Sequence, residues 1–181
     1  MELTLQKRSA SPWLRLENEQ RKKGSAKSKT LFPLLKMQGY SNRRVFMNDE
    51  KITKREVSST EMLQSIIAHF GPRAPFVENT IYNLMDMLSE DYQGGSWKYF
   101  ELSNGGFYMS PTSRESYNIS WNDNYYEGTM SADAAGITAC LFAYSHMSFR
   151  ANFEQLSEHY QKLYEFMAAH EESEEIFAAI D

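Results

Sequence analysis

The sequence predicts a single compact α+β domain, in which a small antiparallel meander sheet is flanked by about four to five helices. Three observations lead to this prediction. Apolar residues recur every three to four positions before Gly94 and after Ser131, which is the helical period. Between these two residues the apolar positions alternate, which is the period of a strand. The charge changes near Met47, so that a basic head precedes an acidic body.

Two helices are expected before the sheet. The first begins at a capping Ser59 or Thr60 and ends at Gly71, and its apolar stripe consists of Met62, Leu63, Ile66, Ile67 and Phe70. The second accepts Pro75 in its first turn, where the missing N–H costs nothing, and extends toward Gly94. Its stripe consists of Ile81, Leu84, Met85 and Leu88.

Four strands are expected between the two groups of helices. The segments SWKYFEL and FYMS form a hairpin through residues 103–106, because Asn and Gly tolerate positive φ in a tight turn. SYNISW follows as a half-exposed antiparallel strand, and its inward face consists of Tyr117, Ile119 and Trp121. Residues 122–124 turn the chain into the last strand, YYEGTM.

Three helices complete the chain. The first starts at Ser131 as its N-cap, with Asp133 in the first turn, and buries Ile137, Cys140, Leu141 and Tyr144. The next starts near Asn152, and its stripe consists of Phe153, Leu156, Tyr160, Leu163 and Met167. A short acidic helix capped by Ser173 ends the chain and turns Ile176, Phe177 and Ile180 inward.

The formal net charge of −5 hides a strong asymmetry. Residues 1–46 carry 11 Lys and Arg against 3 Asp and Glu, which gives +8, and residues 47–181 carry 8 against 21, which gives −13. We expect residues 1–50 to be a basic N-terminal extension that is disordered or non-native, with a nucleic-acid-binding arm as the functional alternative. Residues 51–181 are expected to form the domain.

Cysteine content and hydropathy indicate a cytoplasmic protein. Cys140 is the only cysteine, so no intramolecular disulfide can form, which fits a reducing compartment. No run of about 18 apolar residues is present, so no transmembrane helix is expected.

The glycine pairs and the histidines do not match catalytic or metal-binding motifs. Gly94-Gly95 follows a helix and enters a strand, and Gly105-Gly106 joins two strands, so neither fits a phosphate-binding loop. Ser103 lies at a strand-to-strand turn, unlike a nucleophile elbow. The four histidines show no metal-binding spacing and are expected on helix faces or ends: His69, His146, His159 and His170. We therefore expect no enzyme activity, no metal and no cofactor.

Several unusual segments occur together in this chain. They are DYQGGSWKYFELSNGGFYMSP, then MSADAAGITACLFAYSH, with HFGPR upstream and HYQKLYEFMAAHEESEEIFAAID downstream. The combination of G-G-x-W, L-S-N-G-G-F-Y-M-x-P and S-A-D-A-A-G-I resembles the ArdB/KlcA antirestriction family over about residues 51–181. The resemblance implies a small cytoplasmic protein of plasmids and other mobile DNA, with a compact mixed α/β domain. It also implies relief of type I restriction of incoming unmodified DNA, without catalysis or a cofactor.

Two functional interpretations follow. The first is an antirestriction protein that contacts a host restriction–modification protein or another DNA-handling protein, since an acidic domain favours basic partners. The alternative is a nucleic-acid-binding module that uses the basic N-terminal segment and the aromatic residues of the sheet. Direct DNA binding by residues 51–181 is not expected, because the sheet region offers only Lys98 and Arg114 to phosphates. No membrane partner is expected.

The interaction surface is expected at turns and helix ends, which expose side chains on a rigid scaffold. The candidate residues are Gly94, Gly95, Trp97, Asn104, Gly105, Gly106, Ser131 and Asp133. Each also has a purely structural explanation, namely turn geometry for the glycines, core packing for Trp97 and helix capping for Ser131 and Asp133.

Overall fold

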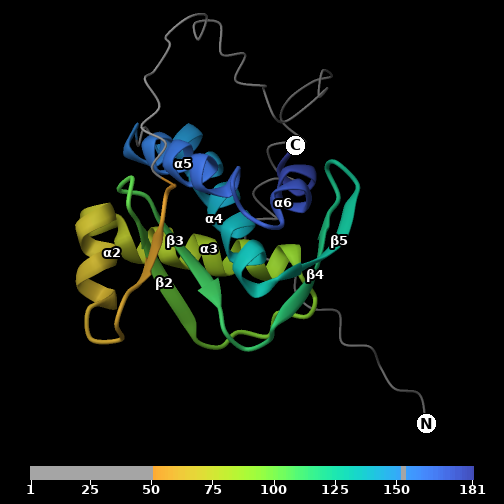
Figure 1. Ribbon diagram of the computed structural model, residues 1–181, viewed down its shortest axis with the longest axis horizontal. Coiled ribbons are helices and arrows are strands. Elements are labelled where there is room, and N and C mark those ends of the chain that lie inside the picture. Colours follow the sequence, from red (N-terminus) through yellow and green to blue (C-terminus); the bar gives the residue numbers. More distant parts are fainter. Residues whose placement is uncertain (1–50, 152–153) are drawn as a thin grey trace, which may run out of the picture. The chain divides into compact units, whose positions relative to one another are not determined.

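The computed structural model describes residues 51–151 and 154–181, which belong to one compact unit, Asp49–Asp181. The expectation for residues 1–50 lies outside this described part. The elements in chain order are β1 (Lys54–Glu56), α2 (Met62–Phe70), the 3₁₀ turn η1 (Gly71–Arg73), α3 (Ala74–Leu88), β2 (Trp97–Leu102), β3 (Phe107–Pro111), β4 (Ser116–Trp121), β5 (Tyr126–Ser131), α4 (Ala132–Ala151), α5 (Glu154–Met167) and α6 (Ser173–Ile180) (Figure 1). The predicted α+β class is confirmed.

The strands form two sheets, where the sequence suggested one meander. β1, β2 and β3 form an antiparallel sheet in that order, and among the described strands β4 pairs with β5 alone. The β2–β3 hairpin has the expected register, with Trp97 opposite Pro111. Proline cannot donate to a ladder, and β3 ends at this residue before the chain leaves for the second sheet. β1 was not expected, because its three residues are all exposed and show no apolar alternation.

Helices α2 and α3 lie close to their predicted positions but differ at one end each. The N-cap of α2 is Glu61 and has no side-chain capping bond, so the expected cap at Ser59 or Thr60 is wrong. α2 stops before Gly71, whose φ of +56° with a ψ of −139° is a backbone conformation that glycine adopts more readily than other residues. α3 ends at Leu88, well before Gly94, because Ser89 is extended.

The short C-terminal helix α6 also starts differently from the expectation. Its N-cap is Glu172, again without a side-chain capping bond, so Ser173 is the first helical residue and not the cap. Ile176 is buried as predicted. None of the described helices is long and apolar enough to cross a membrane.

α4 is the centre of the core. It packs against β3, α3, α5 and α6, and its predicted inward residues are completely buried: Ile137, Cys140, Leu141 and Tyr144. Gly136 allows α4 to approach β3 closely, because a Cβ there would lie 2.3 Å from the Met109 carbonyl oxygen and 2.7 Å from the Ser110 Cα. The glycine of the S-A-D-A-A-G-I segment is therefore required by helix-to-strand packing.

Candidate interaction site

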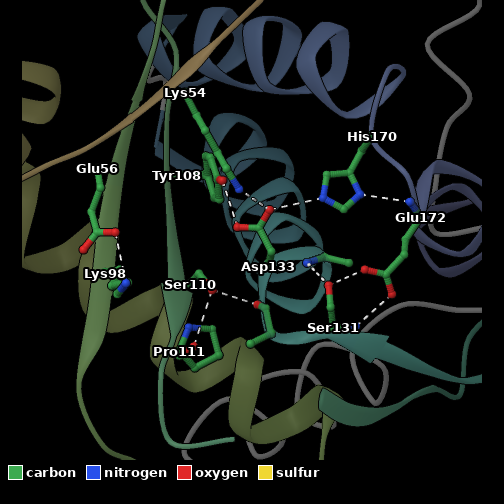
Figure 2. A network of polar contacts seen from close by, with 12 residues as sticks. Lys54, Glu56, Lys98, Tyr108, Ser110, Pro111, Ser131, Asp133, His170 and Glu172 are labelled. Carbon is green, nitrogen blue, oxygen red and sulfur yellow. Dashed lines mark hydrogen bonds and ion pairs between the residues drawn. The ribbon is translucent and has the colours of Figure 1, made fainter. Parts of the chain in front are cut away.

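The first turn of α4 is the meeting point of three other segments. Ser131 Oγ accepts the Ala134 N–H at 3.2 Å, which confirms the predicted N-cap. Asp133 Oδ1 accepts the Tyr108 hydroxyl at 2.9 Å, and its Oδ2 accepts Lys54 Nζ at 2.6 Å (Figure 2). His170 Nε2 lies 3.1 Å from the same Oδ2. The Asp133 carboxylate thus connects β1, β3 and the α5–α6 loop.

The surroundings of Asp133 favour its charged form. Burial alone would raise its pKa, but the hydrogen bonds from His170, Lys54 and Tyr108, together with the Lys54 charge, lower the pKa to about 2. Burial raises the pKa of Tyr108, so its phenol remains a donor at neutral pH. The network therefore consists of an ionised carboxylate with three donors around it.

Both ring nitrogens of His170 are occupied. Nδ1 accepts the Glu172 N–H at 3.0 Å, so the neutral ring carries its proton on Nε2, which faces Asp133. A histidine bonded in this way has no lone pair left to act as a general base. His170 lies beyond the end of α5, and its contact with Asp133 was not expected from its position near a helix end.

Glu172 joins the same site from the α5–α6 loop. Its Oε1 accepts the Ser131 N–H at 2.8 Å, and its Oε2 accepts the Ser131 hydroxyl (Figure 2). Glu172 is therefore engaged within the fold, although it belongs to the acidic segment at residues 171–175. Its carboxylate holds the α5–α6 loop against the end of β5.

The β2–β3 turn is attached to helix α5. Asn104 Nδ2 donates to the Lys162 carbonyl at 2.9 Å, and Asn104 Oδ1 accepts the Gly106 N–H at 3.1 Å. Gly105 has a φ of +78°, as the predicted hairpin turn requires. Both ends of the Asn104 amide are thus engaged within the fold.

The remaining candidates lie at the start of β2. Gly94 and Gly95 have φ values of +81° and +127°, and Ser113 Oγ donates to the Gly94 carbonyl at 3.3 Å. Trp97 is only 6% exposed, and its Nε1 donates to the Tyr92 hydroxyl at 2.9 Å. Trp97 is therefore a core residue, and any influence it has on a partner is indirect.

The predicted residues thus fall into three separate places. Ser131 and Asp133 share one network, whereas the Asn104 turn and the Gly94–Trp97 segment each have their own contacts. Sequence reasoning missed the other members of the Asp133 network, namely Lys54, Tyr108, His170 and Glu172. No local signal could have identified Lys54, which is 79 positions from Asp133 in the chain.

The described residues contain no group of three or more His, Cys, Asp or Glu side chains placed to hold a metal ion. Cys140 is buried, and burial raises the pKa of its thiol to about 12. The Asp133 carboxylate connects its neighbouring segments through hydrogen bonds and an ion pair.

Known proteins resemble this chain in sequence and in structure. Residues 90–181 match the family model described as "Antirestriction protein". The antirestriction protein KlcA of Escherichia coli is 36% identical over 138 residues, which cover 74% of this chain and 97% of that protein. The uncharacterized protein YafX of E. coli K12 is 38% identical over 117 residues, covering 62% of this chain and 77% of YafX.

A solved structure from work on KlcA and ArdB shows the same architecture. It superposes with a TM-score of 0.67 at 37% identity, covering 75% of this chain and 100% of that chain. Those proteins are described as having a novel fold and antirestriction activity against type I DNA restriction systems in vivo but not in vitro. The chain described here therefore belongs to the ArdB/KlcA antirestriction family.

Proposed function

We propose that this protein relieves the restriction of incoming unmodified DNA by type I restriction–modification systems, acting in the cytoplasm through protein contacts and without catalysis. The observation that supports this most directly is the match of residues spanning 75% of the chain to the whole of a KlcA/ArdB-type structure. The Asp133 network agrees with a non-catalytic role, because its carboxylate oxygens and the ring nitrogens of His170 already have partners.

The proposed partner is a host restriction–modification protein or another DNA-handling protein. Such proteins present basic surfaces to phosphates, and residues 47–181 of this chain carry a net charge of −13. Long-range attraction would therefore accelerate their association.

The ion pairs of the sheet region argue against direct DNA binding by the same surface. Lys98 Nζ lies 3.0 Å from Glu56, and Lys54 Nζ lies 2.6 Å from Asp133. Arg114 pairs with Asp91 at 3.7 Å. These cations already face carboxylates, so a phosphate would have to compete with a neighbouring anion for each of them.

Phage plating tests this function in cells, where KlcA and ArdB are active. The full chain is expressed in a host with an active type I system and in a restriction-deficient twin, and both are infected with unmodified phage. We expect the chain to raise plating only on the restricting host. If the folded chain does not change plating on that host, the proposed function is wrong.

The predicted interaction surface forms a second part of the proposal. Asn104 and Asp133 are its partly exposed polar centres, so Asn104→Ala and Asp133→Ala are tested in the same assay. Circular dichroism confirms that each variant is folded at the plating temperature. We expect reduced antirestriction from both variants, and full activity in both would reject this surface.

A further inference from the structure

Helix α2 lies at the periphery of the domain and exposes apolar side chains to solvent (Figure 1). Its apolar stripe is divided between two sides, because Ile66 and Phe70 are buried. Leu63, in contrast, is 71% exposed and Ile67 is 47% exposed. These two residues are four positions apart, so they lie on one face of the helix, called here the outer face of α2. Surface helices normally carry polar residues on that side, and adjoining apolar side chains there indicate an interaction site.

The opposite side of α2 is fixed to the three-stranded sheet. Ser65 Oγ donates to Glu101 Oε1 of β2 at 2.6 Å. The ring of His69 packs against the ring of Phe107 in β3, with 4.9 Å between the ring centroids. The helix therefore cannot turn its outer face inward without losing these contacts. A face held in this way loses little entropy when a partner binds it.

The outer face of α2 belongs to an uncharged part of a highly charged domain. Residues 62–72 contain no Asp, Glu, Lys or Arg, although residues 47–181 contain 8 Lys and Arg and 21 Asp and Glu. Burial lowers the pKa of His69, so that its ring is neutral at pH 7. A charged surface placed on this face would lose its hydration without gaining an opposite charge. The partner that fits the face is therefore apolar and uncharged.

The activity of the relatives indicates when such a partner is accessible. KlcA and ArdB are described as active against type I systems in vivo but not in vitro. A protein that blocked an assembled restriction–modification complex would act in both settings. The subunit interfaces of permanent complexes are strongly apolar, and the subunits expose them only before they assemble. A purified complex therefore no longer presents this kind of surface.

We propose that the outer face of α2 binds the apolar interface of a type I restriction–modification subunit before this subunit enters its complex. The inference rests on the proposed function and specifies both the partner and the stage at which it is bound. Leu63 and Ile67 cover part of the surface that another subunit would cover in the complex. Binding thus competes with assembly and lowers the amount of active restriction complex in the cell.

Biolayer interferometry on isolated subunits tests the contact. The full chain is immobilised and exposed to each purified subunit of a type I complex and to the assembled complex. We expect binding to at least one isolated subunit and no binding to the assembled complex. Leu63→Gln combined with Ile67→Gln should weaken binding about tenfold or more, because both side chains lose apolar burial. Glutamine is a good helix former, so Tm should change by less than about 3 °C.

Tyr125→Gln is the matched control, because it makes the same kind of change at another exposed site. Tyr125 is 90% exposed on the turn between β4 and β5. Asn124 Nδ2 holds this turn to α6 by donating to the carbonyls of Ala178 and Ala179, each at 3.0 Å. The Tyr125→Gln variant should bind the subunit with wild-type affinity. Equal weakening by this control and by the double variant in α2 would reject the inference.

The order of addition tests the effect on assembly. The subunits are mixed either together with the chain or before the chain is added, and DNA cleavage by the mixture is measured. At about ten times its dissociation constant, the chain should leave about a tenth of its subunit free. Cleavage should therefore fall when the chain is present during mixing and stay unchanged when the chain is added afterwards. The double variant in α2 should have little effect in either order.

Several results would overturn the inference: no binding to any isolated subunit, equal binding to the assembled complex, cleavage lowered in both orders of addition, or a dimer of this chain that depends on Leu63 and Ile67 in sedimentation. Phage plating identifies which proposal fails. Full rescue of phage by the double variant in α2 would keep the antirestriction function and reject the docking face. Subunit binding that depends on the outer face, without rescue by the wild-type chain, would keep the docking face and reject the function.

Discussion

The three-stranded sheet and the β4–β5 hairpin are both antiparallel, but different interactions hold them in place. β3 is buried at every position beneath α4, and exposed ion pairs cross the sheet between β1 and β2, with Arg55 2.6 Å from Glu101. The hairpin alternates buried and exposed residues along β4 and has no Lys or Arg. The sheet is thus positioned mainly by close packing, whereas the hairpin also depends on polar contacts at its margins.

The polar contacts at the two edges of the hairpin are of the same kind, a backbone N–H that donates to a carboxylate. The Asn118 N–H of β4 donates to Asp91 at 3.0 Å, and the Ser131 N–H of β5 donates to Glu172 at 2.8 Å. Each outer edge of the hairpin therefore has a backbone donor capped by a carboxylate, which opposes pairing with another strand. Substitutions in the packed sheet should therefore affect the stability of the domain more than substitutions in the hairpin.

The largest expected effect is that of Gly136→Ala. The new methyl group would collide with the β3 backbone, so we expect a loss of about 3 kcal/mol in the free energy of unfolding, measured by urea denaturation. Gly128→Ala in the hairpin is the matched control. Its methyl group would meet only the Tyr126 side chain, which can move, so it should cost less than about 1 kcal/mol. Equal costs would contradict the comparison.

Protonation of the buried His159 should lower the stability of the domain at acidic pH. Burial and the neighbouring His69 lower its pKa to about 4, and its Nδ1 has no hydrogen-bond partner. In the unfolded chain, this histidine binds a proton at about pH 6.5, whereas in the folded chain it does so only at about pH 4. The free energy of unfolding should therefore decrease by about 3 kcal/mol as the pH is lowered from about 6.5 to about 4. Urea denaturation at several pH values measures this slope. His159→Leu should flatten it, and an unchanged slope would reject this assignment.

The stabilisation of the fold by Asp133 should depend on pH in a lower range than that of His159. Its folded pKa of about 2 is below the ordinary 3.8, so its stabilisation, about 2 kcal/mol, is present above about pH 4 and lost as pH falls toward 2. Asp133→Asn should therefore be destabilising at pH 7 and about half as destabilising at pH 3, which lies between the folded and unfolded pKa values. Asp123→Asn on the exposed hairpin turn should change stability by less than about 0.5 kcal/mol. A constant difference between wild type and Asp133→Asn at both pH values would contradict this explanation.

The smallest expected effect concerns the edge of the hairpin. Asp91→Ala removes the acceptor of the Asn118 N–H and should cost about 1 kcal/mol. Amide hydrogen exchange should accelerate at Asn118 more than at Met109, which lies in the packed sheet. Uniform acceleration at both amides would show that the hairpin and the sheet open together.

The sequence predicted the features that depend on local periodicity and on a residue's own conformational limits. The stripe of α3, the N-cap at Ser131 and the Asn104 turn were all correct. The caps at Ser59 or Thr60 and at Ser173 were wrong, because α2 and α6 begin after Glu61 and Glu172 without a side-chain capping bond, so capping propensity does not decide where they start. β1 was missed because three exposed polar residues become a strand only when β2 supplies the partner.

By itself, the sequence determined the α+β class, the order of the predicted helices and strands and the family motifs, since all of these depend on short-range spacing and residue identity. Only the tertiary structure decided that the strands divide into two sheets and that Lys54, Tyr108, His170 and Glu172 gather around the start of α4. It also revealed that Tyr125 is exposed on a fixed turn. These features require contacts between residues far apart in the chain, which come together only when burial of the core offsets the entropy of closing the intervening loops.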